Sequence, residues 1–155
     1  MGVLSVRDNM TIANLNRFSP GGILRKRQME AACKGQRDAL AIKTPSLSQL
    51  IKNLSGGNQQ KVLVSRWLMT LPDVLMIDEP TRGIDVGAKY EIYGIINQLA
   101  EAGKAVIVIS SEMPELLGIS DRIYVMNDGR LVAEMPAKEA SQEKIMRAIM
   151  KSWEN

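Results

Sequence analysis

The chain has 155 residues, with 20 Lys and Arg against 17 Asp and Glu, one cysteine and no histidine. Its length suits one domain or a large piece of one, and 45% apolar and 24% charged residues indicate a soluble globular protein. The lone Cys33 excludes an internal disulfide and a cysteine-cluster metal site, and the lack of histidine excludes Ser-His-Asp, Cys-His and histidine-ligated zinc chemistry. No apolar run is long enough for a membrane helix, and a net charge of +3 is too small to indicate nucleic acid unless it is clustered.

The first half of the chain is predicted to be helical. Apolar residues recur at helical spacing over residues 5–15 and again over the basic segment 23–42, with a Ser-Pro-Gly-Gly turn between the two. Residues 46–49 have the spacing of a capping box, which predicts that a further helix starts before Leu50. A long helix is then expected after Gly57, ending before the proline at position 72.

Strands and helices alternate in the second half. Residues 74–77 and 105–109 are short apolar runs suited to buried parallel strands, and residues 88–100 between them have the spacing of a helix. This order predicts a βαβ unit of an α/β fold. The Asn-Asp-Gly sequence at 127–129 predicts a hairpin turn between two further strands, and residues 141–153 are expected to form a closing amphipathic helix.

Several noticeable side chains are expected to pack or to face solvent rather than to bind ligands. Trp67 lies within a helical pattern and is interpreted as core packing, and the basic run 25–27 as a solvated helix face rather than a nucleic-acid site. Six methionines are interpreted as core filler rather than as a thioether metal site: Met10, Met29, Met69, Met76, Met146 and Met150.

The segment 54–61, Leu-Ser-Gly-Gly-Asn-Gln-Gln-Lys, is the first that points to chemistry. Gly56 and Gly57 would let a backbone come close to a ligand, and the N-terminus of the helix that follows attracts phosphate. Ser55 could add a hydroxyl donor. Taken alone, however, the pattern fits a loop followed by a helix cap about equally well.

Paired carboxylates follow the first predicted strand. An ionised acid at an apolar strand end needs a partner or a metal, so Asp78 suits a Mg²⁺ ligand and Glu79 a base that orients water. In isolation, two acids in a solvent-facing turn would be the simpler interpretation, and Asp85 would be a helix cap. Ser111, after the next predicted strand, would lie with Asp78 and Glu79 at the carboxyl edge of the sheet, where ligands gather in open α/β folds.

The order and spacing of these motifs outweigh the simpler interpretations. The sequence LSGGNQQK, then an apolar strand ending in DEPT, then GID, then a strand ending in SSE, resembles that of an ATP-binding cassette (ABC) ATPase. GGNQQK, DEPTRGIDVGAK, ISSEMPELLG and SDRIYVMNDGRL are typical of the C-terminal cassette in the ATP-binding subunits of bacterial monosaccharide importers. The resemblance covers nearly the whole chain.

This resemblance implies part of a P-loop NTPase nucleotide-binding domain, of α/β class. A helical subdomain would occupy residues 1–53, and the signature motif and C-terminal part of the core residues 54–155. The resemblance implies ATP and Mg²⁺ as cofactors. The signature residues would contact an ATP that is bound by the opposing cassette: Ser55, Gly56, Gly57, Asn58 and Gln59.

Four further residues match positions with known roles in the family. Asp78 matches the Walker B aspartate, which serves Mg²⁺, and Glu79 matches the catalytic glutamate. Asp85 belongs to the D-loop, and Ser111 stands at the switch position that histidine normally holds. Because a hydroxyl cannot reproduce the charge and geometry of an imidazole, we expect the catalytic site of this cassette to be impaired.

The resemblance also implies a role and partners. The subunit would couple ATP binding and hydrolysis to monosaccharide import, as a peripheral protein on the cytoplasmic face of the bacterial inner membrane. Its partners would be an N-terminal cassette with an intact Walker A motif, transmembrane permease subunits and, indirectly, a periplasmic sugar-binding protein. No nucleic-acid partner is expected.

One family feature is absent from the printed sequence. It contains no G-x-x-x-x-G-K-[ST] phosphate loop, since its only Gly-Lys pair, at 103–104, is followed by alanine. We therefore expect this chain alone not to hydrolyse ATP, to be the last third of a two-cassette protein, and to expose strand edges and apolar surface. The alternatives are a non-hydrolytic module that docks on a membrane subunit or an intact cassette and, less favoured, a DNA-repair or translation ATPase.

Overall fold

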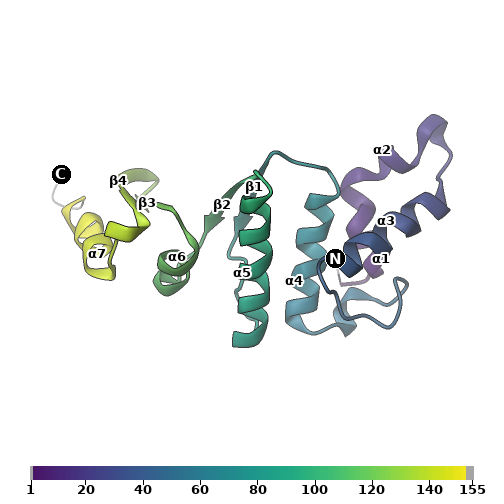
Figure 1. Cartoon of the computed structure of the whole chain (residues 1–155), viewed down its shortest axis with the longest axis horizontal. Helices are drawn as coiled ribbons and strands as arrows, with labels where there is room; N and C mark the ends of the chain where they lie inside the picture. The colour runs from purple at the N-terminus through teal and green to yellow at the C-terminus, as the bar shows by residue number, and fades with distance from the viewer. Residues whose placement is uncertain (1, 153–155) are drawn as a thin grey trace. The chain divides into compact units, whose positions relative to one another are not determined.

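The computed structural model of the chain describes residues 2–152 (Figure 1). Its contacts group into two compact units, Met1–Ile107 and Val108–Asn155. None of the helices described within residues 2–152 combines the length and the hydrophobicity needed to cross a bilayer. The predicted subdomain boundary between residues 53 and 54 lies inside the first unit and stays a prediction.

The first unit begins with helices and ends with a strand–helix–strand segment. In chain order its elements are α1 (Val6–Thr11), η1 (Ile12–Asn14), α2 (Leu15–Phe18), η2 (Pro20–Gly22), α3 (Lys26–Ala39), η3 (Ile51–Asn53), α4 (Gly56–Leu68), β1 (Val74–Asp78), α5 (Val86–Glu101) and β2 (Ala105–Ile109), the last of which runs into the second unit. The helix predicted over residues 5–15 is therefore broken into short pieces. The other long helices and both strands lie close to their predicted positions.

Helix α1 is the centre of the helical part and packs against α3 and α4 (Figure 1). Val6 and Met10 of α1 are fully buried. The buried Arg66 of α4 donates from Nε to the Asn9 carbonyl at 2.7 Å and from Nη2 to Asn9 Oδ1 at 2.6 Å. These bonds satisfy a guanidinium whose pKa is lowered by burial, and they fix α4 on α1.

The capping box predicted over residues 46–49 is wrong. Leu50 pairs with Ser5 in an isolated antiparallel bridge, and the Ile51 N–H donates to the Leu4 carbonyl at 3.1 Å. Only the single turn η3 follows. Backbone groups of Gln49 and Ile51 that a longer helix would need bond instead to Val6 and Leu4. Because these partners are more than forty residues away, no local sequence pattern predicts them.

Strands β1 and β2 pair in a two-stranded sheet. Leu75 and Ile77 of β1 are buried, whereas Val74 and Met76 on the other face are more than half exposed, and Ile107 of β2 is also exposed. The strands are thus confirmed in position, but the expectation that they are buried on both faces is wrong for residues 2–152. The expectation of exposed apolar surface is confirmed.

The second unit is a hairpin with helices against it. It contains α6 (Met113–Ile119), β3 (Arg122–Asn127), β4 (Arg130–Pro136), η4 (Ala137–Glu139) and α7 (Gln142–Lys151). Strands β3 and β4 are antiparallel, with Asn127 opposite Arg130, and both turn residues have positive φ, 48° at Asp128 and 74° at Gly129. The predicted hairpin is therefore confirmed. It forms here because Asn, Asp and Gly tolerate the positive φ that this turn requires.

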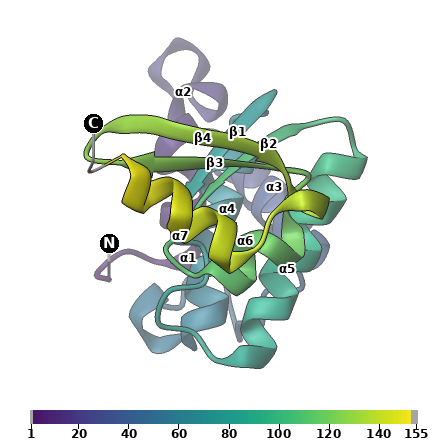
Figure 2. The same cartoon turned by 90° about the vertical axis from the view of Figure 1, so that its left-hand side faces the viewer.

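The core of the second unit lies between the hairpin and α7. Helix α7 runs along the hairpin (Figure 2), and Ile145 packs with Ile123 and Val125 of β3. Ser141 caps α7, since its hydroxyl accepts from the Lys144 N–H at 3.2 Å. Trp153, at the end of the predicted closing helix, lies outside the described residues.

Two predictions about packing need correction. Trp67 is 53% exposed, so it is not core packing within the described residues. Helical spacing shows which residues share a face but not whether another element covers that face. The methionines divide: Met10, Met29 and Met69 are buried, whereas Met76, Met146 and Met150 are exposed.

Candidate functional site

The N-terminus of α4 is the first part of the site. The first helical hydrogen bond runs from the Gln59 N–H to the Ser55 carbonyl at 2.9 Å, so the N–H groups of Gly56, Gly57 and Asn58 have no acceptor inside the helix. The Ser55 side chain does not cap them; its Oγ accepts from Asn58 Nδ2 at 2.8 Å and keeps its own proton to donate. Ser55 and Gly56 are exposed. This arrangement fits an anion such as phosphate.

The two glycines also have a role inside the chain. A Cβ on Gly57 would lie 2.5 Å from the Ala88 Cβ, and a Cβ on Gly56 would lie 3.1 Å from Ile84 Cγ2. Because the first distance is far below van der Waals contact, only glycine lets α4 approach the first turn of α5 this closely. The sequence pattern related these glycines to a ligand alone, and no local signal indicated this contact.

Asn58 and Gln59 hold the neighbouring loops. Asn58 Oδ1 accepts from the Lys43 N–H at 2.7 Å, and Gln59 Nε2 donates to the Leu54 carbonyl at 2.8 Å. Asn58 therefore connects the segment after α3 to Ser55, while Gln59 fixes Leu54, the residue before the N-cap. Their contact with ATP stays a prediction.

Lys61, the last residue of the signature segment, has a structural role that was not predicted from the sequence. Its buried Nζ donates to the Ala41 carbonyl at 3.2 Å and pairs with Glu91 Oε2 of α5 at 2.8 Å. The hydrogen bond and charge of Lys61 hold the pKa of Glu91 below its usual value. This role could have been predicted, because helical spacing places Lys61 on the same inward face as Val64, and a buried cation needs a partner.

The paired carboxylates lie at the end of β1. Asp78 is exposed, and Glu79 is half-buried with φ of 46°, a left-handed conformation that non-glycine residues seldom adopt. Pro80 is buried directly behind them, and the Arg82 N–H donates to the Glu79 carbonyl at 3.2 Å. Backbone in sparsely populated regions tends to occur at functional sites, so this geometry agrees with a role for the pair.

Protein side chains alone do not form a metal-binding cluster within residues 2–152. No three cysteine, aspartate or glutamate side chains in that part come together in a way that could hold a metal ion. Asp78 is an exposed hard oxygen donor of the kind that Mg²⁺ prefers, so it fits as one ligand of a site completed by other groups.

Asp85 begins the next helix. Its Oδ1 accepts from the Ala88 N–H at 2.9 Å, which confirms the interpretation of Asp85 as a helix cap. Its D-loop role stays a prediction. Since Ala88 also faces Gly57, the loop that contains Asp85 and the start of α4 contact the same turn of α5.

Ser111 belongs to the second unit. It is exposed and lies between β2 and α6, where the neighbouring Ser110 hydroxyl accepts from the Glu112 N–H at 3.0 Å. Its role at the switch position stays a prediction.

Known proteins are similar to the chain in sequence and in fold. The family model described as ABC transporter matches residues 3–82. The chain is 57% identical over 147 residues to the galactose/methyl galactoside import ATP-binding protein MglA of Clostridium tetani. It is 52% identical over 147 residues to the L-arabinose transport ATP-binding protein AraG of Geobacillus stearothermophilus.

The lengths covered differ between the chain and these relatives. The two matches cover 94% and 95% of the chain but only 29% of each relative, so the chain spans less than a third of their length. Among solved structures, the ATP-binding cassette MJ1267 of an ABC transporter matches with a TM-score of 0.77 and 24% identity, over 94% of this chain and 62% of that cassette. This match confirms the α/β fold class.

Proposed function

The chain belongs to the ABC transporter family, and we propose that it is the C-terminal part of the ATP-binding subunit of a monosaccharide importer. Two relatives support this proposal: each is more than 50% identical to the chain, and their names describe import of galactosides and transport of arabinose. The complete subunit would couple ATP binding and hydrolysis to uptake of the sugar.

The observation that carries the proposal is the uncapped start of α4. Three N–H groups there have no acceptor inside the helix and the exposed Ser55 keeps a hydroxyl proton to donate, while the helix dipole adds a partial positive charge. The sequence contains no phosphate loop. We therefore assign Ser55, Gly56 and Gly57 to the phosphates of an ATP held by a partner cassette with an intact Walker A motif, with Asn58 and Gln59 holding that end of the helix in place.

The carboxylates at the end of β1 are assigned to the nucleotide of their own cassette. Bound Mg²⁺ neutralises phosphate charge, and Asp78 would supply one of its ligands, directly or through water. Glu79 would orient a water molecule and accept its proton. Asp85 would contact the opposing cassette, and Ser111 would offer a neutral hydroxyl in place of an imidazole, which weakens hydrolysis at this site.

The remaining partners are also part of the proposal. The subunit would bind transmembrane permease subunits at the cytoplasmic face of the bacterial inner membrane, and it would meet a periplasmic sugar-binding protein only through them. The names of the relatives, which describe import and transport, support this assignment.

The test compares two substitutions in the assembled transporter. Ser55→Arg places a bulky cation at the start of α4 and should abolish ATP turnover, whereas Glu79→Gln should reduce it less, because the site that Glu79 serves is already impaired. Ser48→Arg, the same change in an exposed loop, is the control and should leave turnover unchanged. Equal loss from Ser55→Arg and Glu79→Gln would refute the assignment of the two residues to different sites.

A second candidate function is a docking module that does not take part in hydrolysis. The open apolar face of β1 and β2 favours it, because exposed Val74, Met76 and Ile107 offer a surface for a partner. Mixing the chain with an intact cassette distinguishes the two functions. ATP turnover that depends on Ser55 supports the first, whereas binding that is lost in Met76→Asp and unaffected by Ser55→Arg supports the second.

A further inference from the structure

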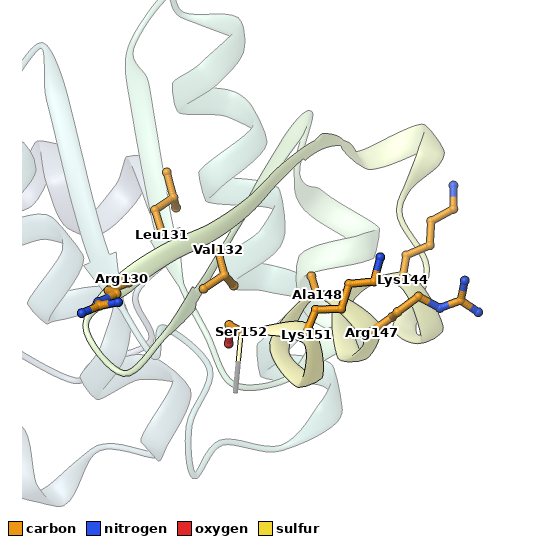
Figure 3. A pocket seen from close by; sticks show the side chains of 8 residues that line it. All are labelled: Arg130, Leu131, Val132, Lys144, Arg147, Ala148, Lys151 and Ser152. Atoms are coloured by element: carbon orange, nitrogen blue, oxygen red, sulfur yellow. The ribbon is translucent and has the colours of Figure 1, made fainter. Parts of the chain in front are cut away.

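A groove of about 470 Å³ lies between β4 and α7, entirely within the second unit (Figure 3). Of the described residues, those that line it include four cations and no acid: Arg130, Leu131, Val132, Lys144, Arg147, Ala148, Lys151 and Ser152. The volume is within the range of pockets that hold small molecules.

The positive charge of the groove is local. Residues 108–152 contain six Lys and Arg against seven Asp and Glu, yet four of those six cations line this one groove. Of the other two, Arg122 pairs with Glu134 at 3.0 Å and Lys138 lies outside the groove. Lys144 Nζ donates to the Glu139 carbonyl at 2.6 Å, which is not an ion pair and leaves its charge uncompensated by an acid. The four cations raise the positive potential along the groove, which attracts an anion.

Helical spacing gathers three of the cations. Lys144, Arg147 and Lys151 recur at intervals of three and four residues and so share one side of α7, while Arg130 lies at the start of β4 beside the hairpin turn (Figure 3). Arg147 pairs with Glu143 at 2.8 Å, and both side chains are largely exposed. Such an exposed pair is weak, so it can yield to an anion with a higher charge.

The walls of the groove are fixed before any ligand binds. Asn127 Nδ2 of β3 donates to Ser152 Oγ at 2.8 Å, and Ser152 Oγ donates to the Ile149 carbonyl at 2.6 Å. Ile145 packs into the core beneath α7. The helix is therefore held on the hairpin at its middle and at its end, which lowers the entropy that binding would cost.

We propose that this groove binds a phosphate group on an organic ligand, either a free phosphate compound or a lipid headgroup. Arginine forks such as those of Arg130 and Arg147 match phosphate oxygens, and lysines add point charge. The apolar side chain of Val132, which points from β4 toward α7, would contact the carbon part of the ligand (Figure 3). The site is separate from the start of α4 and does not depend on the proposed role in ATP turnover.

The test is titration calorimetry of the full chain at low and high salt. The probes are pyrophosphate, glucose 6-phosphate and vesicles of phosphatidylglycerol. We expect saturable binding that weakens with salt, and a dissociation constant at least tenfold higher in Lys144→Glu and in Arg147→Glu. Lys138→Glu makes the same change of charge in the second unit outside the groove and should bind as the natural chain does. Circular dichroism verifies that each variant is folded.

Each outcome decides the proposal. Binding of the soluble probes identifies a free phosphate compound, and binding of vesicles alone that Lys144→Glu abolishes identifies a lipid headgroup. The absence of binding at millimolar probe, or equal weakening by Lys138→Glu, would overturn the groove as a site. Binding that is lost in Ser55→Arg and retained in Lys144→Glu would also overturn it, since the anion would then lie at the start of α4.

Discussion

Two parts of the first unit use the same residue types with opposite results. In α1, Val6 and Met10 are spaced four apart and are 0% exposed; in β1, Val74 and Met76 are spaced two apart and are 57% and 63% exposed. Both spacings place the pair on one face of its element. The difference therefore comes from what covers the face. Helix α1 is enclosed by α3 and α4, whereas one face of β1 stays open within residues 2–152.

This contrast shows which part of the chain is complete as a packing unit. The α1–α4 contact combines buried apolar side chains with the Arg66–Asn9 hydrogen bonds, so it has both the hydrophobic contribution and the specificity of a core. The sheet has one covered face, although strands of this class usually have both faces covered.

The largest expected effect comes from making the same substitution in both parts. Met10→Ala should lower the free energy of unfolding by about 2–5 kcal/mol, because it leaves a cavity in a closed core. Met76→Ala should change it by less than about 0.5 kcal/mol, because most of that side chain is already in water. Urea unfolding followed by circular dichroism measures both. Equal losses would mean that the face of β1 is covered in solution.

A smaller effect is expected from a matched pair of glycines in helices. Gly57→Ala should destabilise the chain by about 1–3 kcal/mol, because the new Cβ would meet the Ala88 Cβ at 2.5 Å. Gly94→Ala in α5 has open space around the new Cβ and should stabilise the chain by up to about 1 kcal/mol through helix propensity. Thermal unfolding compares the two, and a gain at both positions would contradict the close approach of α4 and α5.

The smallest expected effect concerns the ion pair between the two helices. Glu91→Gln should lower the free energy of unfolding by about 0.5–1 kcal/mol at pH 7, an amount limited by the exposure of Glu91. Glu101→Gln, on the same helix, should have no measurable effect. Stability is followed by urea unfolding from pH 3 to 7.

The pH dependence of this pair has a definite sign. Lys61 lowers the pKa of Glu91 in the folded chain, so the pair stabilises the fold above the ordinary value of 4.5 and its contribution is lost as the pH falls through the lower, folded value. The difference between the natural chain and Glu91→Gln should therefore be largest near neutral pH and disappear in acid. A difference that persists at pH 3 would assign the effect to packing.

Local signals explain what could be predicted from the sequence. The strands at β1 and β2, the Asn-Asp-Gly turn and the Asp85 cap all depend on residues within a few positions of one another. The carboxylates at the end of β1 were placed correctly for the same reason, although the positive φ of Glu79 was not predicted.

What could not be predicted depends on distant partners. The bridge between Leu50 and Ser5 replaced the expected helix, and the exposure of Trp67 depends on which elements lie beside α4. In the site, the Asn58–Lys43 bond and the Gly57–Ala88 contact join residues that are 15 and 31 positions apart. Periodicity reports the orientation of a side chain about its own element and gives no information on such neighbours.

The close approach of Gly57 and Ala88 also restricts which pairs of residues can occupy these two positions. Either position has room for a methyl group only if the other has none, so the two residues should be inherited as a pair across lineages. A sequence with alanine at position 57 would need glycine at position 88, and Ala88→Gly should act as a second-site suppressor of Gly57→Ala. Because Ala88 also donates its N–H to Asp85, a compensating change there would alter both the loop for which we propose a partner contact and the helix start for which we propose a nucleotide contact.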